Sequence, residues 1–286
     1  PSPASATPAS FGWDWTATDR AVKAALSRGM KVLANPAYTP GWARPGTSSD
    51  KYPPANNADF ATFVSAAVAR YGPQGVKAWE IWNEPNVSSF WMPKPDAAAY
   101  VRLLRAGYDA VKAVDPQATV ISAGVAHSGG SLDVAAADGS WVSPYRFVNQ
   151  MYAAGAKGAF DALGLHPYAA FPYAPSADLS WNTFQQADDI YALMTSMGDG
   201  GLKIWATEAG YHTAQHPDGV TESQQAEYAV QYLDLWDDWA FTGPFFLYMP
   251  RDRGTDLAAP EENFGLLFRN DFTPKAAYGA LATAIG

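Results

Sequence analysis

The stretch Trp79-Glu80-Ile81-Trp82-Asn83-Glu84-Pro85-Asn86 decides the fold prediction for this chain. Its tryptophans and isoleucine predict a buried strand, and Pro85 ends that strand because proline has no backbone N–H to donate. The strand therefore leads into Glu84, a carboxylic acid at the opening of a loop. In an α/β barrel, residues at this end of a strand form the functional face.

A second predicted strand, Ile204-Trp205-Ala206-Thr207-Glu208-Ala209-Gly210, also ends in a glutamate. Because side chains alternate along a strand, Glu208 shares the interior face with the small Ala206 below it. Glu80 shares the face of Glu84 but lies about 13 Å deeper along its strand. We expect Glu80 to be a buried structural carboxylate, or one bonded to a partner from another strand. Two glutamates at the ends of two strands is the arrangement that glycoside hydrolysis needs.

Outside these stretches, predicted helices and strands alternate, which indicates parallel βα units. The pattern predicts an α/β fold of the (β/α)8 TIM-barrel type, for which 286 residues are enough. We expect helices at about 16–28, 57–71, 96–114, 144–154, 187–197, 222–239 and 274–284, and strands at about 31–36, 79–84, 119–124, 160–166, 204–210 and 244–249.

Only six strands are visible, whereas a closed barrel of this type has eight. Neither the Pro/Ala/Ser-rich segment 1–10 nor the end of the chain resembles a strand. We therefore expect the first two βα units to be missing from this chain, through truncation, through processing, or because a separate segment or chain supplies them. Residues 11–286 are predicted to form a single catalytic barrel domain.

The composition excludes several classes of function. A net charge of −9 argues against nucleic acid or an anionic membrane as a partner, whereas a neutral carbohydrate substrate is compatible with it. The absence of cysteine excludes disulfides and thiolate metal sites. No apolar run is long enough for a membrane span. The segment 1–10 is not a signal peptide, and we expect the protein to be secreted or extracellular.

Four sequence elements, named below, carry a family resemblance. Together with the stretch Thr39-Pro40-Gly41-Trp42-Ala43, these elements resemble clan A glycoside hydrolases. Among these enzymes, family 39 is the most similar and the family 5 cellulase-like enzymes are second. The elements are Trp82-Asn83-Glu84-Pro85, His166-Pro167-Tyr168, Trp205-Ala206-Thr207-Glu208, and the closing motif Asn263-Phe264-Gly265-Leu266…Pro274-Lys275-Ala276-Ala277-Tyr278.

The resemblance implies a role for each matching residue. Glu84 is then the general acid/base, and Glu208 the nucleophile of a retaining glycosidase. Asn83 is implied to bind the 2-hydroxyl of the sugar, Tyr168 to hold Glu208, and His166 to line the same site. In a retaining enzyme the two carboxyl groups lie about 5–5.5 Å apart, so one stays protonated while the other is ionised.

Four other residues are candidates for substrate binding. Trp42 and Tyr211 lie on loops that follow predicted strands, where an aromatic ring stacks on a sugar or packs against a neighbouring loop. His127 also follows a strand end. Tyr248 stands at the end of the last strand, where many clan members have a tryptophan. The arginine that clan members carry near the nucleophile belongs to a strand that this chain lacks.

Two readings compete with a retaining glycosidase. The missing strands make a non-catalytic carbohydrate-binding protein on a degraded barrel the main alternative. A metallohydrolase that uses His166, Glu208 and His212 is disfavoured because there is no HExxH-type spacing, so no metal and no cofactor are expected. The sequence leaves open which sugar is bound, with xylosides, glucans and bacterial exopolysaccharides all compatible, and whether the action is exo or endo.

Overall fold

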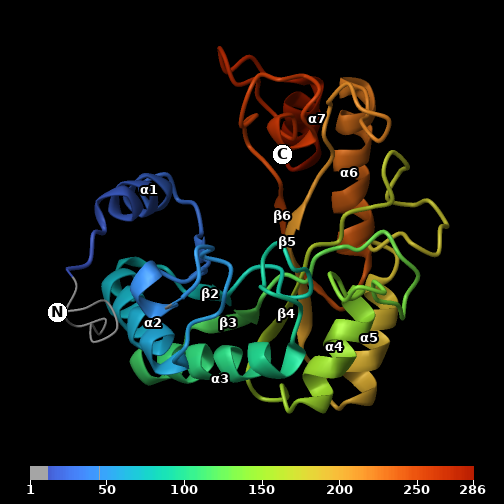
Figure 1. Cartoon of the computed structure of the whole chain (residues 1–286). Coiled ribbons are helices and arrows are strands. Elements are labelled where there is room, and N and C mark those ends of the chain that lie inside the picture. Colours follow the sequence, from blue (N-terminus) through green and yellow to red (C-terminus); the bar gives the residue numbers. More distant parts are fainter. Residues whose placement is uncertain (1–11, 45) are drawn as a thin grey trace. The chain divides into compact units, whose positions relative to one another are not determined.

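A computed structural model describes residues 12–44 and 46–286 of the chain (Figure 1). These residues divide into two compact units. Unit 1 contains the described residues of 1–125, with 135–142 and 146–164, and unit 2 contains 126–134, 143–145 and 165–286. The predicted N-terminal segment 1–10 lies outside the described residues, and the single domain over 11–286 stays a prediction.

Unit 1 is built on a parallel sheet whose strands are neighbours in chain order from β1 to β4. The register places Trp79 beside Val120 and Glu80 beside Ile121. The strands are β1 (Leu33–Ala34), β2 (Ala78–Ile81), β3 (Thr119–Ser122) and β4 (Ala162–Leu165), and the helices are α1 (Thr16–Leu26), α2 (Asn57–Tyr71), α3 (Ala97–Val114) and α4 (Pro144–Ala153), with short 3-10 turns η3 (Gly41–Ala43) and η4 (Gly72–Gln74).

The core of unit 1 lies between this sheet and the helices α2 and α3, which pack side by side (Figure 1). The helix α3 begins where the Asp96 carboxylate accepts a hydrogen bond from the Ala99 amide, a common N-terminal cap. Gly107 in its middle faces Ile81 of β2, and a Cβ there would stand only 3.0 Å from the isoleucine side chain. The glycine therefore lets α3 approach β2 closely, and β2 leads into Glu84.

Glu80 is a structural carboxylate, as the sequence predicts. The residue is buried, and its Oε1 accepts a hydrogen bond of 2.7 Å from the Gly124 amide that follows β3. Its Oε2 accepts one of 2.9 Å from the side-chain amide of Asn35, which follows β1. One carboxylate therefore joins the carboxyl ends of three neighbouring strands. These bonds fix the end of β2, from which the loop with Glu84 begins.

Replacing Glu80 by glutamine is expected to lower the free energy of unfolding by about 2–4 kcal/mol, because a charged acceptor is lost and an amide N–H then faces a backbone donor. Urea unfolding followed by circular dichroism measures the change. Glu227→Gln is the matched control, since Glu227 is exposed on α6 of unit 2. Equal midpoints for the two variants would contradict the structural role.

Unit 2 contains the parallel pair of strands β5 and β6, together with α6 and α7, which pack against each other (Figure 1). The helix α6 begins with a capping box, in which Thr221 and Gln224 each accept a hydrogen bond from the other's backbone amide. The strands are β5 (Lys203–Ala209) and β6 (Thr242–Leu247), and the helices are α5 (Ala187–Ser196), α6 (Glu222–Asp238) and α7 (Ala276–Ala284), with a 3-10 turn η5 (Pro260–Glu262).

The element order confirms the predicted fold class. Six strands alternate with helices in the described residues, every predicted helix and strand is present, and α2 has the predicted bounds. This is the architecture of a partial (β/α)8 barrel. Within the part of the chain that the structure describes, no helix is both long and apolar enough to cross a membrane.

Candidate active site

Glu84 follows β2 on a backbone that leaves the extended conformation abruptly. Trp82 and Glu84 both have positive φ angles, of 74° and 47°. Their amides are nevertheless bonded, because the Trp82 N–H donates to the carbonyl of Pro36 at 3.1 Å and the Glu84 N–H donates to the carbonyl of Gly124 at 3.1 Å. The loop is therefore held at each end by the segments that follow the two neighbouring strands.

Positive φ angles are costly for residues with a side chain, and such strain gathers at functional sites. At Trp82 the cost is offset by packing, since its ring is fully buried against Trp91 and Phe60, and its indole N–H donates to the carbonyl of Phe90. Glu84 is half-buried and keeps its positive φ angle in the loop that follows β2.

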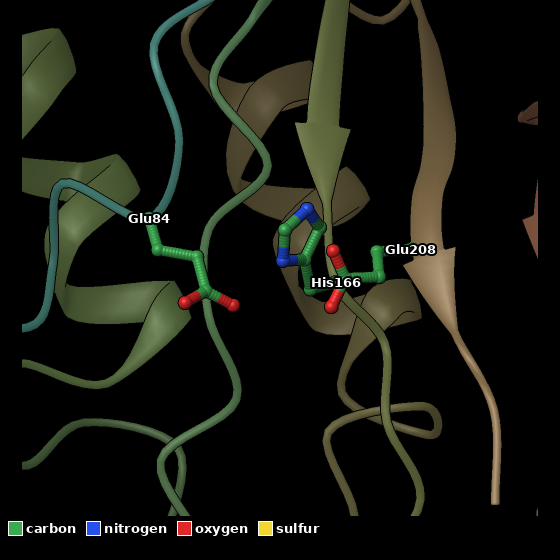
Figure 2. Close-up of side chains that lie close together, drawn as sticks. All are labelled: Glu84, His166 and Glu208. Carbon is green, nitrogen blue, oxygen red and sulfur yellow. The ribbon is translucent and has the colours of Figure 1, made fainter. Parts of the chain in front are cut away.

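Glu208 lies near the carboxyl end of β5 in unit 2. Its Oε1 accepts a hydrogen bond of 2.6 Å from the hydroxyl of Tyr168, which follows β4. A ring nitrogen of the buried His166 lies within 4.8 Å of a Glu208 carboxylate oxygen. Figure 2 shows the side chain of His166 beside that of Glu208. The contact of Tyr168 with Glu208 that the resemblance implies is therefore present.

Aromatic rings surround the Tyr168 side of this group. The ring of His127 lies 5.0 Å from that of Tyr168, and the ring of Phe264 lies 6.0 Å from it at 76°. Tyr248 packs against Phe264 at 5.3 Å, and its hydroxyl accepts a 3.4 Å hydrogen bond from Arg253. Burial raises the pKa of Tyr248 above its ordinary value, although the hydrogen bond from Arg253 lowers it in part, so this hydroxyl stays neutral.

The other two aromatic candidates lie in different surroundings. Trp42 stands on η3 in unit 1 and lines a cavity of about 630 Å³ together with Trp13, Tyr38 and Phe60. Tyr211 is buried in unit 2, where its ring packs against other aromatic rings and its hydroxyl donates to the carbonyl of Tyr173. Both faces of Tyr211 are covered by protein, so stacking on a sugar is the wrong role for it.

The sequence analysis did not single out two residues that contact candidate site residues, Gly124 and Phe264. Gly124 holds both Glu80 and the backbone of Glu84, and Phe264 contacts the rings of Tyr168 and Tyr248. The only signal for Gly124 is its position at the end of a predicted strand. Phe264 belongs to the closing motif, but its sequence neighbours do not reveal which rings it meets.

A parallel α/β fold in which two strands lead into glutamates is typical of the glycoside hydrolases built on (β/α)8 barrels. Residues 11–243 match the family model described as Cellulase (glycosyl hydrolase family 5). The chain therefore belongs to glycosyl hydrolase family 5. The clan A resemblance found in the sequence motifs is confirmed.

Solved structures share this fold at low sequence identity. A family 39 glycoside hydrolase from the gut symbiont Bacteroides cellulosilyticus WH2 is 24% identical with a TM-score of 0.72, over 98% of this chain and 55% of that one. A monomeric β-xylosidase from Caulobacter crescentus CB15 is 20% identical with a TM-score of 0.67, over 94% and 55%. A family 10 endoxylanase from a sugarcane soil metagenome is 16% identical with a TM-score of 0.61, over 97% and 83%.

These identities support the fold alone. The chain spans about half the length of the family 39 structure and of the β-xylosidase that it matches. A comparison with curated proteins gave no match.

Proposed function

We propose that this chain is the catalytic part of a retaining glycosidase that cleaves O-glycosidic bonds of an oligo- or polysaccharide. The observation that carries the proposal is the 2.6 Å hydrogen bond from the Tyr168 hydroxyl to Glu208 at the end of a parallel strand. A hydroxyl that donates to a carboxylate fixes the orientation of that carboxylate. A carboxylate nucleophile needs a fixed orientation toward the anomeric carbon.

The proposed reaction proceeds by two displacements. Glu208 attacks the anomeric carbon while Glu84 gives its proton to the leaving oxygen, which produces a covalent glycosyl-enzyme. Glu84, now ionised, takes a proton from water, and that water releases the sugar from Glu208. The anomeric configuration is retained because it is inverted twice. This mechanism requires the two carboxyl groups to come within about 5–5.5 Å of each other in the working enzyme.

The remaining candidates are assigned to substrate binding. Asn83, beside Glu84, is proposed to bind the 2-hydroxyl, where hydrogen bonds strengthen in the transition state. His166 lies beside Glu208, and His127 and Tyr248 flank the same aromatic group. Trp42 is the candidate for stacking on a sugar ring of the substrate.

The proposed substrate is a neutral glycan, in keeping with the net charge of −9. Structures that share the fold include a β-xylosidase, an endoxylanase and fungal β-1,4-galactanases. A panel of xylosides, glucosides and galactans, tested with the active form of the protein, selects among these. Since a closed barrel has eight strands and the described residues hold six, we also propose that a further segment or chain completes the active form.

The test of the mechanism is a mechanism-based 2-fluoro glycoside followed by peptide mass spectrometry. We expect one equivalent of covalent sugar on Glu208, because the fluorine slows the second step more than attack by the nucleophile. Binding without a covalent adduct would support the alternative, a carbohydrate-binding protein without catalysis. An adduct on another carboxylate would contradict the assignment of Glu208.

Tyr168→Phe is expected to lower kcat/KM by about 10- to 100-fold, because a hydrogen bond to a charged group contributes about 1.5–3 kcal/mol. Steady-state kinetics on an aryl glycoside measure the change. Tyr191→Phe is the matched control. Tyr191 lies on α5, and its hydroxyl donates to the backbone carbonyl of Gly200 instead of to a carboxylate. If both variants keep wild-type rates, Tyr168 has no part in the reaction.

A further inference from the structure

Lys275 and Asp252 form a buried ion pair in unit 2, although neither takes part in the proposed chemistry. The Lys275 side chain is 0% exposed and that of Asp252 is 4% exposed. The Lys275 Nζ lies 2.8 Å from Asp252 Oδ1. Burying two charges is unfavourable unless further hydrogen bonds satisfy both groups, so a pair of this kind is a poor means of gaining stability alone.

The Lys275 ammonium has three N–H donors and three acceptors. Besides Asp252, it donates to the hydroxyl of Thr213 at 2.9 Å and to the carbonyl of Asn263 at 3.3 Å. Thr213 follows β5, Asp252 follows β6, and Asn263 opens the closing motif. Lys275 itself is the residue directly before α7. A single buried cation therefore joins four separate segments of unit 2.

Asp252 also anchors Gly265, which lies two positions after Asn263 in the closing motif. Its Oδ1 also accepts a hydrogen bond of 2.7 Å from the Gly265 amide. A Cβ on Gly265 would overlap the backbone nitrogen of Asp252, so only glycine permits this approach. Phe264 thus lies between two anchored neighbours, Asn263 and Gly265, and its position depends on the ion pair.

The ring of Phe264 contacts two aromatic residues of the candidate site. Its ring meets the ring of Tyr168 edge-on, with centroids 6.0 Å apart, and that of Tyr248 at 5.3 Å. Edge-to-face contacts restrict the orientation of both rings. The hydroxyl of Tyr168 in turn lies 2.6 Å from Glu208. Packed and hydrogen-bonded groups therefore run without a break from Lys275 to the carboxylate.

We propose that Lys275 and Asp252 are positioning residues, which act through Phe264 to hold Tyr168 on Glu208. The inference rests on the proposed function of Glu208 as nucleophile. It also gives the closing motif a physical purpose: glycine allows the close approach, lysine supplies the buried cation, and phenylalanine carries the contact. An apolar core at this place would pack equally well but would not fix the direction of the Tyr168 hydroxyl.

The experiment labels the protein with 3-fluorotyrosine and records its ¹⁹F NMR spectrum. Tyr168→Phe removes one resonance and so assigns it, and Glu208→Gln displaces that resonance by changing its hydrogen-bond partner. We expect Lys275→Met to displace or broaden the same resonance. We also expect kcat on an aryl glycoside to fall about 10-fold or more with KM changed less than twofold, because a hydrogen bond to a charged group is disturbed after binding.

Two further variants separate positioning from stability. Lys112→Met removes a different lysine, which is partly buried and pairs with Asp161 at 2.7 Å in unit 1, and it is expected to leave the Tyr168 resonance in place. Lys275→Met/Asp252→Asn removes both charges but keeps an oxygen for the Gly265 amide. We expect this double variant to regain most of the Tm that Lys275→Met loses, while the Tyr168 resonance stays displaced.

A Tyr168 resonance at the wild-type position in Lys275→Met and in the double variant would overturn the proposal. If neither variant folds, Thr213→Val takes their place, since it removes only the hydroxyl that Lys275 holds, and an unmoved resonance there has the same meaning. The spectrum does not depend on turnover. A completed protein without glycosidase activity would therefore refute the proposed function, whereas the resonance alone decides the role of Lys275.

Discussion

Glu208→Gly is expected to abolish turnover, with a loss in kcat on the order of 10⁴-fold or more, as found when an enzyme loses its covalent nucleophile. The truncated side chain leaves space beside the anomeric carbon. Azide is small enough to enter that space and to attack in place of the carboxylate. We therefore expect added azide to restore part of the activity on an aryl glycoside, with a glycosyl azide of inverted configuration as the product.

The measurement is initial rates with and without azide, followed by NMR of the product. Glu227→Ala is the control, because Glu227 is exposed on α6 and its loss should leave the rate unchanged. A Glu208→Gly variant that retains the wild-type rate would end the assignment of Glu208 as nucleophile. Rescue that yields the retained anomer would place the nucleophile elsewhere.

Glu84→Ala is expected to slow the reaction by about 10²- to 10⁴-fold, the usual contribution of a general acid/base. The loss should depend on the leaving group. A substrate whose leaving oxygen needs protonation should lose the most, and an activated aryl glycoside the least. Azide should again accelerate the reaction, but here it attacks the glycosyl-enzyme, so the product keeps the original configuration.

The comparison variant is Glu80→Gln, from the same strand as Glu84. Its carboxylate bonds to Gly124 and Asn35 within the fold, so any loss of rate in this variant should be independent of the leaving group. Kinetics on a series of aryl glycosides of graded acidity measure the difference. Equal sensitivity of the two variants to the leaving group would remove the acid/base role from Glu84.

Much of unit 1 and unit 2 could be predicted because the relevant signals are local. The apolar stripe of α2, the capping residues of α3 and the alternation along β5 each lie within one short segment. The role of Glu80 followed in the same way, since its depth along a strand is a matter of counting residues. Even so, its partners Asn35 and Gly124 were identified only by the fold.

The aromatic residues show where sequence reasoning stops. Tyr211 and Trp42 both follow predicted strands, yet Tyr211 is buried among other rings while Trp42 lines a cavity. The exposure of a large ring depends on which distant segments cover it. Phe264 is a further case, because its contacts with Tyr168 and Tyr248 join three segments that are far apart in the chain.

The sequence by itself determined the alternating βα architecture, the two strands that lead into Glu84 and Glu208, and the resemblance to clan A glycoside hydrolases. These features depend on residue type, periodicity and short motifs, which are written in consecutive residues. Only the tertiary structure decided that the Tyr168 hydroxyl donates to Glu208, that the Glu84 amide is held by Gly124, and that Lys275 and Asp252 are buried together. Such contacts join residues 23 to 40 positions apart, and a chain specifies them through packing as a whole rather than through any local pattern.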